Sequence, residues 1–354
     1  MPRLKTFIMG AVAALVIGGV APLPATATAT ATGTAAATAA ATGDGSPTDA
    51  NIAFTGRWDT RNAAAYTPYW AGAYFTTGFT GTTVKLKQRN AIDLYYSIDN
   101  GPFVYRTNVS GTVNLTPTPL QPAGHTLRVS YRVVAGSYHG DAVFQGLILD
   151  PGASTFRANV PSTLLEFIGD SITVGTTTSK NALTAYGWLV GERLGVRHTQ
   201  IAQGGACLVA TADGCVGLER RFLKLNPNAD TPDWDFSRYQ AHVVVINLGT
   251  NDSGHGVHTP EFQASYTNLL RQVRAKYPYA TIFAMETFRM KFVAQTQAAV
   301  KTLNDGGDPN VFYVNTEGWL TSGDLSDSVH PNDAGHVKIA NRLAPIIAAR
   351  IGAP

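Results

Sequence analysis

The sequence of residues 167–175 is Phe-Ile-Gly-Asp-Ser-Ile-Thr-Val-Gly. The apolar run 164–168 predicts a buried β-strand, and Gly169 ends it where a strand gives way to a helix. A serine at such a corner is exposed at the carboxyl end of a sheet, beside the first N–H groups of the helix. Ser171 is therefore a candidate nucleophile. Asp170 and Ser171 are also favoured helix caps, and this stretch alone supports both interpretations equally.

The chain that follows alternates apolar strand-like runs with helix-like segments. The runs are 164–168, 200–202, 243–248, 281–285 and 311–314, and the helix-like segments are 185–194, 260–276, 292–303 and 334–349. This alternation predicts an α/β domain over residues 163–354, with a parallel sheet covered by helices on both faces. Ligands of such folds bind beyond the carboxyl ends of the strands, so the polar residues at those ends are candidates for a site.

Four polar blocks lie at or near these strand ends. They are Gly169-Asp170-Ser171, residues 202–207 with Gly204-Gly205, Gly249-Thr250-Asn251-Asp252, and Asp327-Ser328-Val329-His330-Pro331-Asn332. Together they supply a nucleophile, a base with a carboxylate beside it, and N–H donors for a developing oxyanion. Those are the groups that acyl transfer requires.

Each group has a defined role in that chemistry. The hydroxyl of Ser171 is too weak an acid to attack unaided, so an imidazole must remove its proton. Histidine is the side chain suited to this transfer near neutral pH, so His330 is the candidate base, and Asp327 can accept its other ring N–H and fix the tautomer. The oxyanion donors are the backbone N–H of Ser171, the backbone N–H of Gly205 and the side-chain amide of Asn251.

Alternatives remain for each block taken alone. Asp327 and His330 are also consistent with a surface pair beside a helix cap, and the glycine and asparagine blocks with turns. His336 is the main rival base, and His255 and His258 lie close to Asn251 in the sequence. All four polar blocks occur together, each at or near a strand end and in the order that the chemistry requires. This combination favours the catalytic interpretation, with His330 as the base.

Residues 51–153 show the alternation of half-buried antiparallel strands. Apolar and polar side chains alternate over 84–87, 92–98 and 127–133, and Asp99-Asn100-Gly101 suits a tight hairpin turn. Short strands with frequent glycines predict a β-sandwich of jelly-roll type.

Four aromatic residues of this region admit two interpretations. Trp58, Trp70, Tyr74 and Phe75 are candidates for a sugar-stacking face, but packing in the core of a small sandwich is the commoner role.

The N-terminus predicts export. Residues 1–27 have a short basic head, an apolar middle and a small-residue ending, as in a signal peptide. Residues 28–50 are rich in Ala and Thr and predict a flexible spacer. No later apolar stretch is long enough to span a membrane. We expect a secreted, extracellular monomer that is not embedded in a membrane.

The net charge of the protein indicates that its partner is neither a nucleic acid nor a membrane. The formal net charge is +3, and loss of Arg3 and Lys5 with the signal peptide leaves about +1. A nearly neutral protein gives no support to binding of nucleic acid or anionic membranes. Neutral polymers stay possible.

The two cysteines, Cys207 and Cys215, predict a disulfide in an exported protein. It would close a short loop beside the glycine block. Two thiols with no histidine at ligand spacing make a poor zinc site, so we predict no metal and no cofactor.

The four blocks together resemble those of the SGNH (GDSL-like) hydrolases, in the order of that family, across about residues 164–351. The resemblance implies a flavodoxin-like three-layer α/β/α fold and metal-free ester hydrolysis through a serine acyl-enzyme. It implies Ser171, His330 and Asp327 as the triad, and Ser171, Gly205 and Asn251 as the oxyanion hole. The glycine block departs from the usual pattern, so Gly205 is preferred to Gly204 without being required.

The first domain resembles that of carbohydrate esterase family 2. The similar pieces are Gly56-Arg57-Trp58-Asp59, Ile98-Asp99-Asn100-Gly101, Gly124-His125-Thr126-Leu127 and Phe144-Gln145-Gly146. Those enzymes join an N-terminal jelly roll to an SGNH domain and deacetylate plant polysaccharides such as xylan or mannan. Some are thought to use a dyad, whereas Asp327 here suggests a full triad.

The leading functional hypothesis is a secreted carbohydrate O-acetylesterase acting on an acylated polysaccharide or a small ester. A lipase or general short-chain esterase of the same superfamily is the second hypothesis. The third is a carbohydrate-binding protein with an inactive hydrolase domain.

Overall fold

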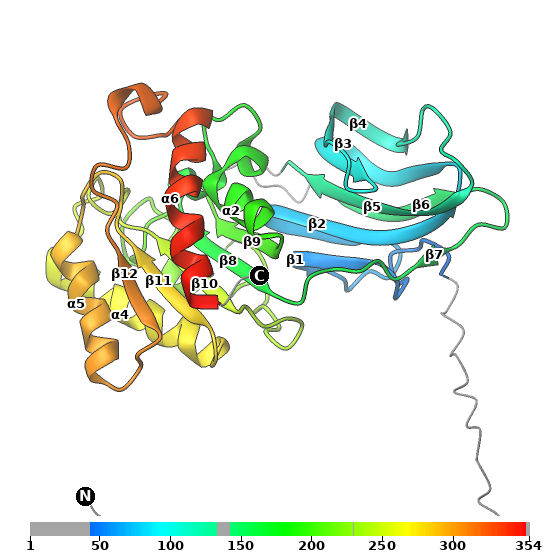
Figure 1. The fold of residues 1–354 in the computed structure, drawn as a ribbon. Coiled ribbons are helices and arrows are strands. Elements are labelled where there is room, and N and C mark those ends of the chain that lie inside the picture. Colours follow the sequence, from blue (N-terminus) through cyan, green and yellow to red (C-terminus); the bar gives the residue numbers. More distant parts are fainter. Residues whose placement is uncertain (1–42, 133–141, 229, 352–354) are drawn as a thin grey trace, which may run out of the picture. The chain divides into compact units, whose positions relative to one another are not determined.

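The computed structural model describes residues 43–132, 142–228 and 230–351 (Figure 1). The predicted signal peptide, 1–27, and the first part of the predicted spacer, 28–42, lie outside the described residues. Within the described residues, no helix has the length and apolar character needed to cross a bilayer.

The first part of the chain is built of antiparallel strands. They are β1 (Ala53–Asp59), β2 (Thr67–Gly81), β3 (Val84–Ile98), β4 (Val104–Asn114), β5 (Ala123–Tyr131), β6 (Val143–Leu149) and β7 (Thr155–Phe156). β2 pairs with β1, β5 and β7, and β3 pairs with β4, β5 and β6. The predicted antiparallel strands are therefore present, while their closure into a jelly roll stays a prediction.

The local sequence explains these strands. In β3 the apolar residues Val84 and Leu86 are buried, and the lysines between and after them, Lys85 and Lys87, are exposed. The predicted hairpin turn after β3 is confirmed, since the N–H of Gly101 donates to the carbonyl of Ile98 at 2.9 Å. Asp99 and Asn100 adopt φ values of 53° and 56°, which a two-residue hairpin turn of this kind requires.

The aromatic residues considered for sugar stacking belong to the interior. Trp58, Trp70, Tyr74 and Phe75 are all buried. Trp58 and Phe75 lie in the hydrophobic core of the β-region, with Phe79 and Leu127. The packing interpretation therefore holds for all four, and none offers a ring face to a polysaccharide.

The end of the predicted spacer is ordered by specific contacts. Gly43 forms backbone hydrogen bonds with Thr155, and the Asp49 carboxylate accepts the N–H of Gly45 at 2.8 Å and the hydroxyl of Thr155. The prediction of a flexible spacer therefore does not hold for residues 43–50. The composition lacks large apolar groups, but one carboxylate satisfies several polar partners and fastens the segment to β7.

The second part of the chain is an α/β domain. Its strands are β8 (Leu164–Gly169), β9 (Arg197–Ala202), β10 (Val243–Asn247), β11 (Thr281–Met285) and β12 (Val311–Val314). Its helices are α1 (Ser171–Val174), η1 (Asn181–Thr184), α2 (Tyr186–Leu194), α3 (Leu218–Arg221), α4 (Thr259–Lys276), α5 (Val293–Asp305), η2 (Ser322–Asp324) and α6 (Asp333–Ile351). The five strands pair in parallel in the order β12-β11-β10-β8-β9, which confirms the predicted parallel sheet.

Both faces of this sheet are covered (Figure 1). Along β10, Val243 and Val245 pack in the core that contains residues of α2 and α6, while Val244 and Ile246 pack in the core that contains residues of α4 and α5. A strand buried on both faces reads as a nearly continuous apolar run, as residues 243–246 of β10 do before Asn247 ends the strand.

The strand order determines where a ligand can bind. β8 pairs with β9, the next strand in sequence, on one side and with β10 on the other. The chain thus changes direction across the sheet beside β8, and such a switch point opens a crevice at the carboxyl ends of the strands. Ser171 follows β8 and Asn251 follows β10, so both lie beyond the carboxyl ends of the two strands at the switch point, where a crevice is expected.

A buried arginine links the two parts of the chain. Arg57 of β1 is fully buried, and its Nη1 donates to the carbonyls of Phe222 (2.6 Å) and Lys224 (2.5 Å). Its Nη2 lies 3.8 Å from the carboxylate of Glu166, which is also buried. In addition Ala71 of β2 pairs with Gln200 of β9, so the two sets of strands form one mixed sheet.

Candidate active site

The turn after β8 positions Ser171. Asp170 is fully buried and caps α1, its Oδ1 accepting the N–H of Ile172 at 2.9 Å. A side chain at Gly169 would lie 2.0 Å from the hydroxyl oxygen of Thr173, so only glycine fits there. Asp170 therefore takes the capping role, and Ser171, 6% exposed, is left to present its hydroxyl at the crevice.

The structure brings together the three side chains that the sequence singled out as a triad. His330 Nε2 lies 2.9 Å from Ser171 Oγ, and His330 Nδ1 lies 2.8 Å from Asp327 Oδ2. Ser171 and His330 are 159 positions apart in the chain, so only the fold creates this contact. A carboxylate accepts but does not donate, which places a hydrogen on Nδ1 and leaves Nε2 to accept from the serine hydroxyl.

Local hydrogen bonds shape the loop between η2 and α6. Asp327 Oδ1 accepts the backbone N–H groups of Val329 and His330, both at 2.7 Å. These bonds and the imidazole lower the pKa of Asp327 to about 2, the N–H of His330 contributing most. The carboxylate is thus ionised at neutral pH and can hold the imidazole in one orientation.

The rival histidines lie elsewhere. His336 is fully buried, its Nδ1 accepts the N–H of Tyr186 at 3.0 Å, and burial lowers its pKa to about 4. His255 Nδ1 bonds to the carbonyl of Asp213 at 2.7 Å, and His258 precedes α4 as its N-cap residue. Among the described residues, His330 is the imidazole within hydrogen-bonding distance of Ser171.

Two of the predicted oxyanion donors, Gly205 and Asn251, belong to loops that contact each other. Asn251 Nδ2 donates to the carbonyl of Ala206 at 2.8 Å, which places the amide beside the glycine block and uses one of its two hydrogens. Gly205 is exposed and has φ +72°, a conformation that favours glycine. Gly204 does not have a positive φ, so the two glycines differ in backbone conformation, and Gly205 as the oxyanion donor stays a prediction.

Asp252 received no role of its own from the sequence, where it is only the last residue of the block Gly249-Thr250-Asn251-Asp252. It is fully buried, and its carboxylate accepts the N–H of Leu208 at 2.9 Å and that of Val209 at 3.0 Å. Burial raises its pKa. The available signal was an acid directly after Asn251 at the end of an apolar strand, because a buried carboxylate there needs N–H partners.

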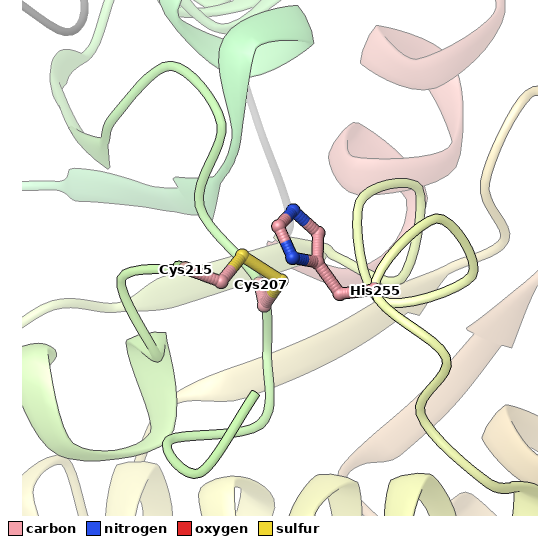
Figure 2. Close-up of side chains that lie close together, drawn as sticks. All are labelled: Cys207, Cys215 and His255. Carbon is pink, nitrogen blue, oxygen red and sulfur yellow. A yellow bond between two sulfur atoms is a disulfide. The ribbon is translucent and has the colours of Figure 1, made fainter. Parts of the chain in front are cut away.

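The predicted disulfide between Cys207 and Cys215 is present, and His255 lies next to it (Figure 2). Zinc binds cysteine as thiolate, and neither sulfur of an intact disulfide is one. These three side chains therefore offer no complete ligand set while the bond persists. Their contribution is to the shape of the loop that carries Gly205.

The arrangement has the elements of acyl transfer. A hydroxyl contacts an imidazole, the imidazole contacts an ionised carboxylate, and the two loops that carry the predicted N–H donors contact each other through Asn251. Such a site can take a proton from an alcohol and stabilise negative charge on a carbonyl oxygen.

Two family models match the chain. The model described as GDSL-like lipase/acylhydrolase family matches residues 167–338, and the model described as carbohydrate esterase 2 N-terminal matches residues 54–158.

Curated proteins show the same similarity. The cellulase/esterase CelE of Acetivibrio thermocellus is 26% identical over 329 residues, which cover 85% of this chain and 40% of that protein. An acetylxylan esterase/glucomannan deacetylase of Cellvibrio japonicus is 26% identical over 325 residues, covering 84% of this chain and 88% of the relative. The chain thus spans less than half the length of CelE.

Solved structures agree in fold. A family two carbohydrate esterase from Clostridium thermocellum, in complex with cellohexaose, has a TM-score of 0.74 at 25% identity and covers 86% of this chain and 100% of that one. A family two carbohydrate esterase from Cellvibrio japonicus has a TM-score of 0.71 at 21% identity, over 86% of this chain and 96% of that one.

Proposed function

Since the chain belongs to the GDSL-like acylhydrolases, carries a carbohydrate esterase 2 N-terminal domain and is thus a carboxylic ester hydrolase, we propose that it removes acetyl or similar short acyl groups from a polysaccharide. The observation that carries the mechanism is the contact of His330 Nε2 with Ser171 Oγ at 2.9 Å, with Asp327 2.8 Å behind the imidazole.

The first half of the reaction forms an acyl-enzyme. Ser171 Oγ attacks the ester carbonyl carbon while His330 Nε2 takes the hydroxyl proton, and Asp327 stabilises the imidazolium. The N–H groups of Ser171, Gly205 and Asn251 hold the negative charge on the carbonyl oxygen. The carbon–oxygen bond to the sugar then breaks, and His330 returns the proton to the leaving sugar hydroxyl.

The second half releases the acid. A water attacks the acyl carbon as His330 removes its proton, the same donors stabilise the second tetrahedral intermediate, and the bond to Ser171 Oγ breaks. Ser171 recovers its proton and the carboxylic acid leaves.

The substrate class rests on the relatives. Two curated relatives are named acetylxylan esterase/glucomannan deacetylase, and a solved relative is described in complex with cellohexaose. The formal net charge of +3 for the whole chain, or about +1 without the two basic residues of the predicted signal, suits a neutral polysaccharide.

The organisation follows the same proposal. Residues 51–153 form a jelly-roll domain and residues 163–354 the hydrolase domain. Residues 1–27 direct export, and the mature protein acts outside the cell as a monomer. Mass spectrometry of secreted protein tests the cleavage site, and size-exclusion chromatography with light scattering tests the oligomeric state.

Acetate release from acetylated xylan and acetylated glucomannan tests the activity, and NMR of the product identifies the ester position. We expect release from at least one polymer, and faster hydrolysis of p-nitrophenyl acetate than of the octanoate. Faster turnover of the octanoate would favour a lipase, and no turnover of any ester would favour a binding protein with an inactive domain.

The Ser171→Ala variant tests the nucleophile. We expect it to fold, to lose hydrolysis and to lose covalent labelling by a fluorophosphonate, because Ser171 carries the hydroxyl that contacts His330 in the described part of the chain. Undiminished turnover in this variant would refute the serine mechanism.

A further inference from the structure

Two loops at the crevice are joined by their side chains. One loop follows β9 and contains Gly205, and the other follows β10 and contains Asn251. Asn251 Nδ2 donates to the carbonyl of Ala206 at 2.8 Å, and His255 Nδ1 bonds to the carbonyl of Asp213 at 2.7 Å. The two loops therefore hold each other at both ends of the contact.

Asp252 supplies the buried part of this junction. Its Oδ2 accepts the N–H of Leu208 at 2.9 Å, and its Oδ1 accepts the N–H of Leu208 at 3.1 Å and of Val209 at 3.0 Å. A fully buried carboxylate is costly unless such donors surround it, so its position and that of the two N–H groups determine each other.

The bonds leave little freedom to the residues next to Gly205. Ala206 is held through its carbonyl by Asn251, Cys207 by the disulfide to Cys215, and Leu208 and Val209 by Asp252. Gly205 is the residue immediately before this anchored segment. Its N–H direction is set by where the segment lies, because Gly205 itself has φ +72° and no side chain.

We propose that Asp252 is a positioning residue of the oxyanion hole, which holds the loop of Gly205 against Asn251 so that both N–H donors converge on the carbonyl oxygen of the substrate. This inference rests on the proposed function, since it presupposes that Gly205 and Asn251 stabilise the oxyanion.

The chemistry requires a carboxylate at this position. Both oxygens of Asp252 accept from backbone N–H groups, and an amide in its place turns one of them into an NH₂ group that faces an N–H donor. The Asp252→Asn variant keeps the size of the side chain, but we expect the segment 206–209 to move away from the clash.

Asp150 offers a matched control. Its Oδ2 accepts the backbone N–H groups of Thr82 and Thr83, at 2.6 and 3.0 Å, in the β-region. Asp150→Asn therefore removes the same kind of carboxylate clamp from a loop that is not part of the crevice. General loss of stability affects both variants, whereas misplacement of oxyanion donors affects only Asp252→Asn.

The first measurement is steady-state hydrolysis of p-nitrophenyl acetate. We expect Asp252→Asn to lower kcat by about 10- to 100-fold with KM changed by less than about 3-fold, since a misplaced donor acts on the transition state. Asp150→Asn should keep the wild-type kcat. If Asp252→Asn does not fold, Asp252→Glu, which keeps both acceptor oxygens, replaces it with the same expected direction. A wild-type kcat in folded Asp252→Asn, or in Asp252→Glu where that variant replaces it, overturns the proposal. A loss of kcat in Asp150→Asn equal to that of the Asp252 variant also overturns it.

The second measurement is coupling between variants. Asp252→Asn combined with Asn251→Ala should cost less than the product of the two single losses, because both act on the same donors. Combined with Asp327→Asn, its loss should multiply. Multiplication in both pairs overturns the positioning role. If instead Ser171→Ala keeps full turnover, the proposed function fails, whatever the Asp252 variants do.

Discussion

The base of Ser171 and the proposed oxyanion donors are held in different ways, and we call these two groups the base side and the donor side. On the base side, Asp327 and His330 lie three positions apart on one loop, with side chains 46% and 21% exposed. On the donor side, the contacts join residues 206–209 to Asn251 and Asp252, some 45 positions later, and Asp252 is fully buried. One side is a short local motif and the other a buried junction of two loops.

This difference indicates how each side resists change. A partly exposed carboxylate can be replaced in part by water, so a lesion at Asp327 leaves an imidazole that still accepts a hydrogen bond. A donor that is lost or misplaced on the buried side has no such substitute. We therefore expect loss of an oxyanion donor to lower kcat more than loss of the Asp327 carboxylate does.

The largest effect is expected from His330→Ala. Without the imidazole no group accepts the proton of Ser171, so we expect kcat for p-nitrophenyl acetate to fall by roughly 10⁴-fold or more. Stopped-flow or long-incubation assays measure it, with circular dichroism as a control for folding. Retention of more than a tenth of the activity would show that another group acts as the base.

Asn251→Ala tests the donor side. Loss of one oxyanion donor should lower kcat by about 100- to 1,000-fold, with a smaller change in KM. Thermal unfolding separates this from instability, because the variant also removes the bond to Ala206. A normal kcat would exclude the amide of Asn251 from the oxyanion hole.

Asp327→Asn should lower kcat less than Asn251→Ala does, because the Asp327 side chain is partly exposed to water. We expect a loss in kcat on the order of 10- to 100-fold, because water can accept the Nδ1–H of His330 in place of the carboxylate. If the loss equals that of His330→Ala, the carboxylate does more than orient the ring. Since the pKa of Asp327 lies at about 2, its ionisation should not limit activity between pH 5 and 8.

The smallest effect is expected far from both sides, at His125. Its Nδ1 bonds to Asp99 and its Nε2 to the carbonyl of Gln121, and the Asp99 carboxylate raises the pKa of the imidazole. A raised pKa stabilises the fold at low pH, and this contribution disappears as pH rises through the pKa of the folded state. We expect less than about 1 kcal/mol after solvent screening, since half of the Asp99 side chain is exposed.

Urea unfolding at pH 5.5 and pH 8.5 measures this contribution, and His125→Gln should remove the pH-dependent part while leaving kcat at pH 7 unchanged. A rise in the stability of the wild-type protein with pH, absent in the variant, would contradict the expected sign. A loss of kcat in His125→Gln would show that the β-region influences the site.

Much of the candidate site could be predicted from the sequence, because its residues belong to short local motifs. Asp327 and His330 share one loop, and Ser171 follows an apolar strand and a glycine, so spacing and residue type were enough to name them. The spacer failed for the opposite reason. Its composition predicts no core, but the Asp49 carboxylate accepts hydrogen bonds from Gly45 nearby and from Thr155 of β7, 106 positions away.

Local patterns in the sequence were enough to predict the alternation of strands and helices in the α/β domain, the hairpin turn at Asn100 and the polar residues at the strand ends. Alternation, turn chemistry and strand ends are properties of neighbouring residues. The three-dimensional packing was needed to show that His330, and not His336, contacts Ser171. It was also needed to show that Trp58 and Phe75 are core residues and that Asp252 binds the loop of Gly205. Those outcomes depend on which distant segments pack together, and a buried group is assigned its role by the partners it meets there.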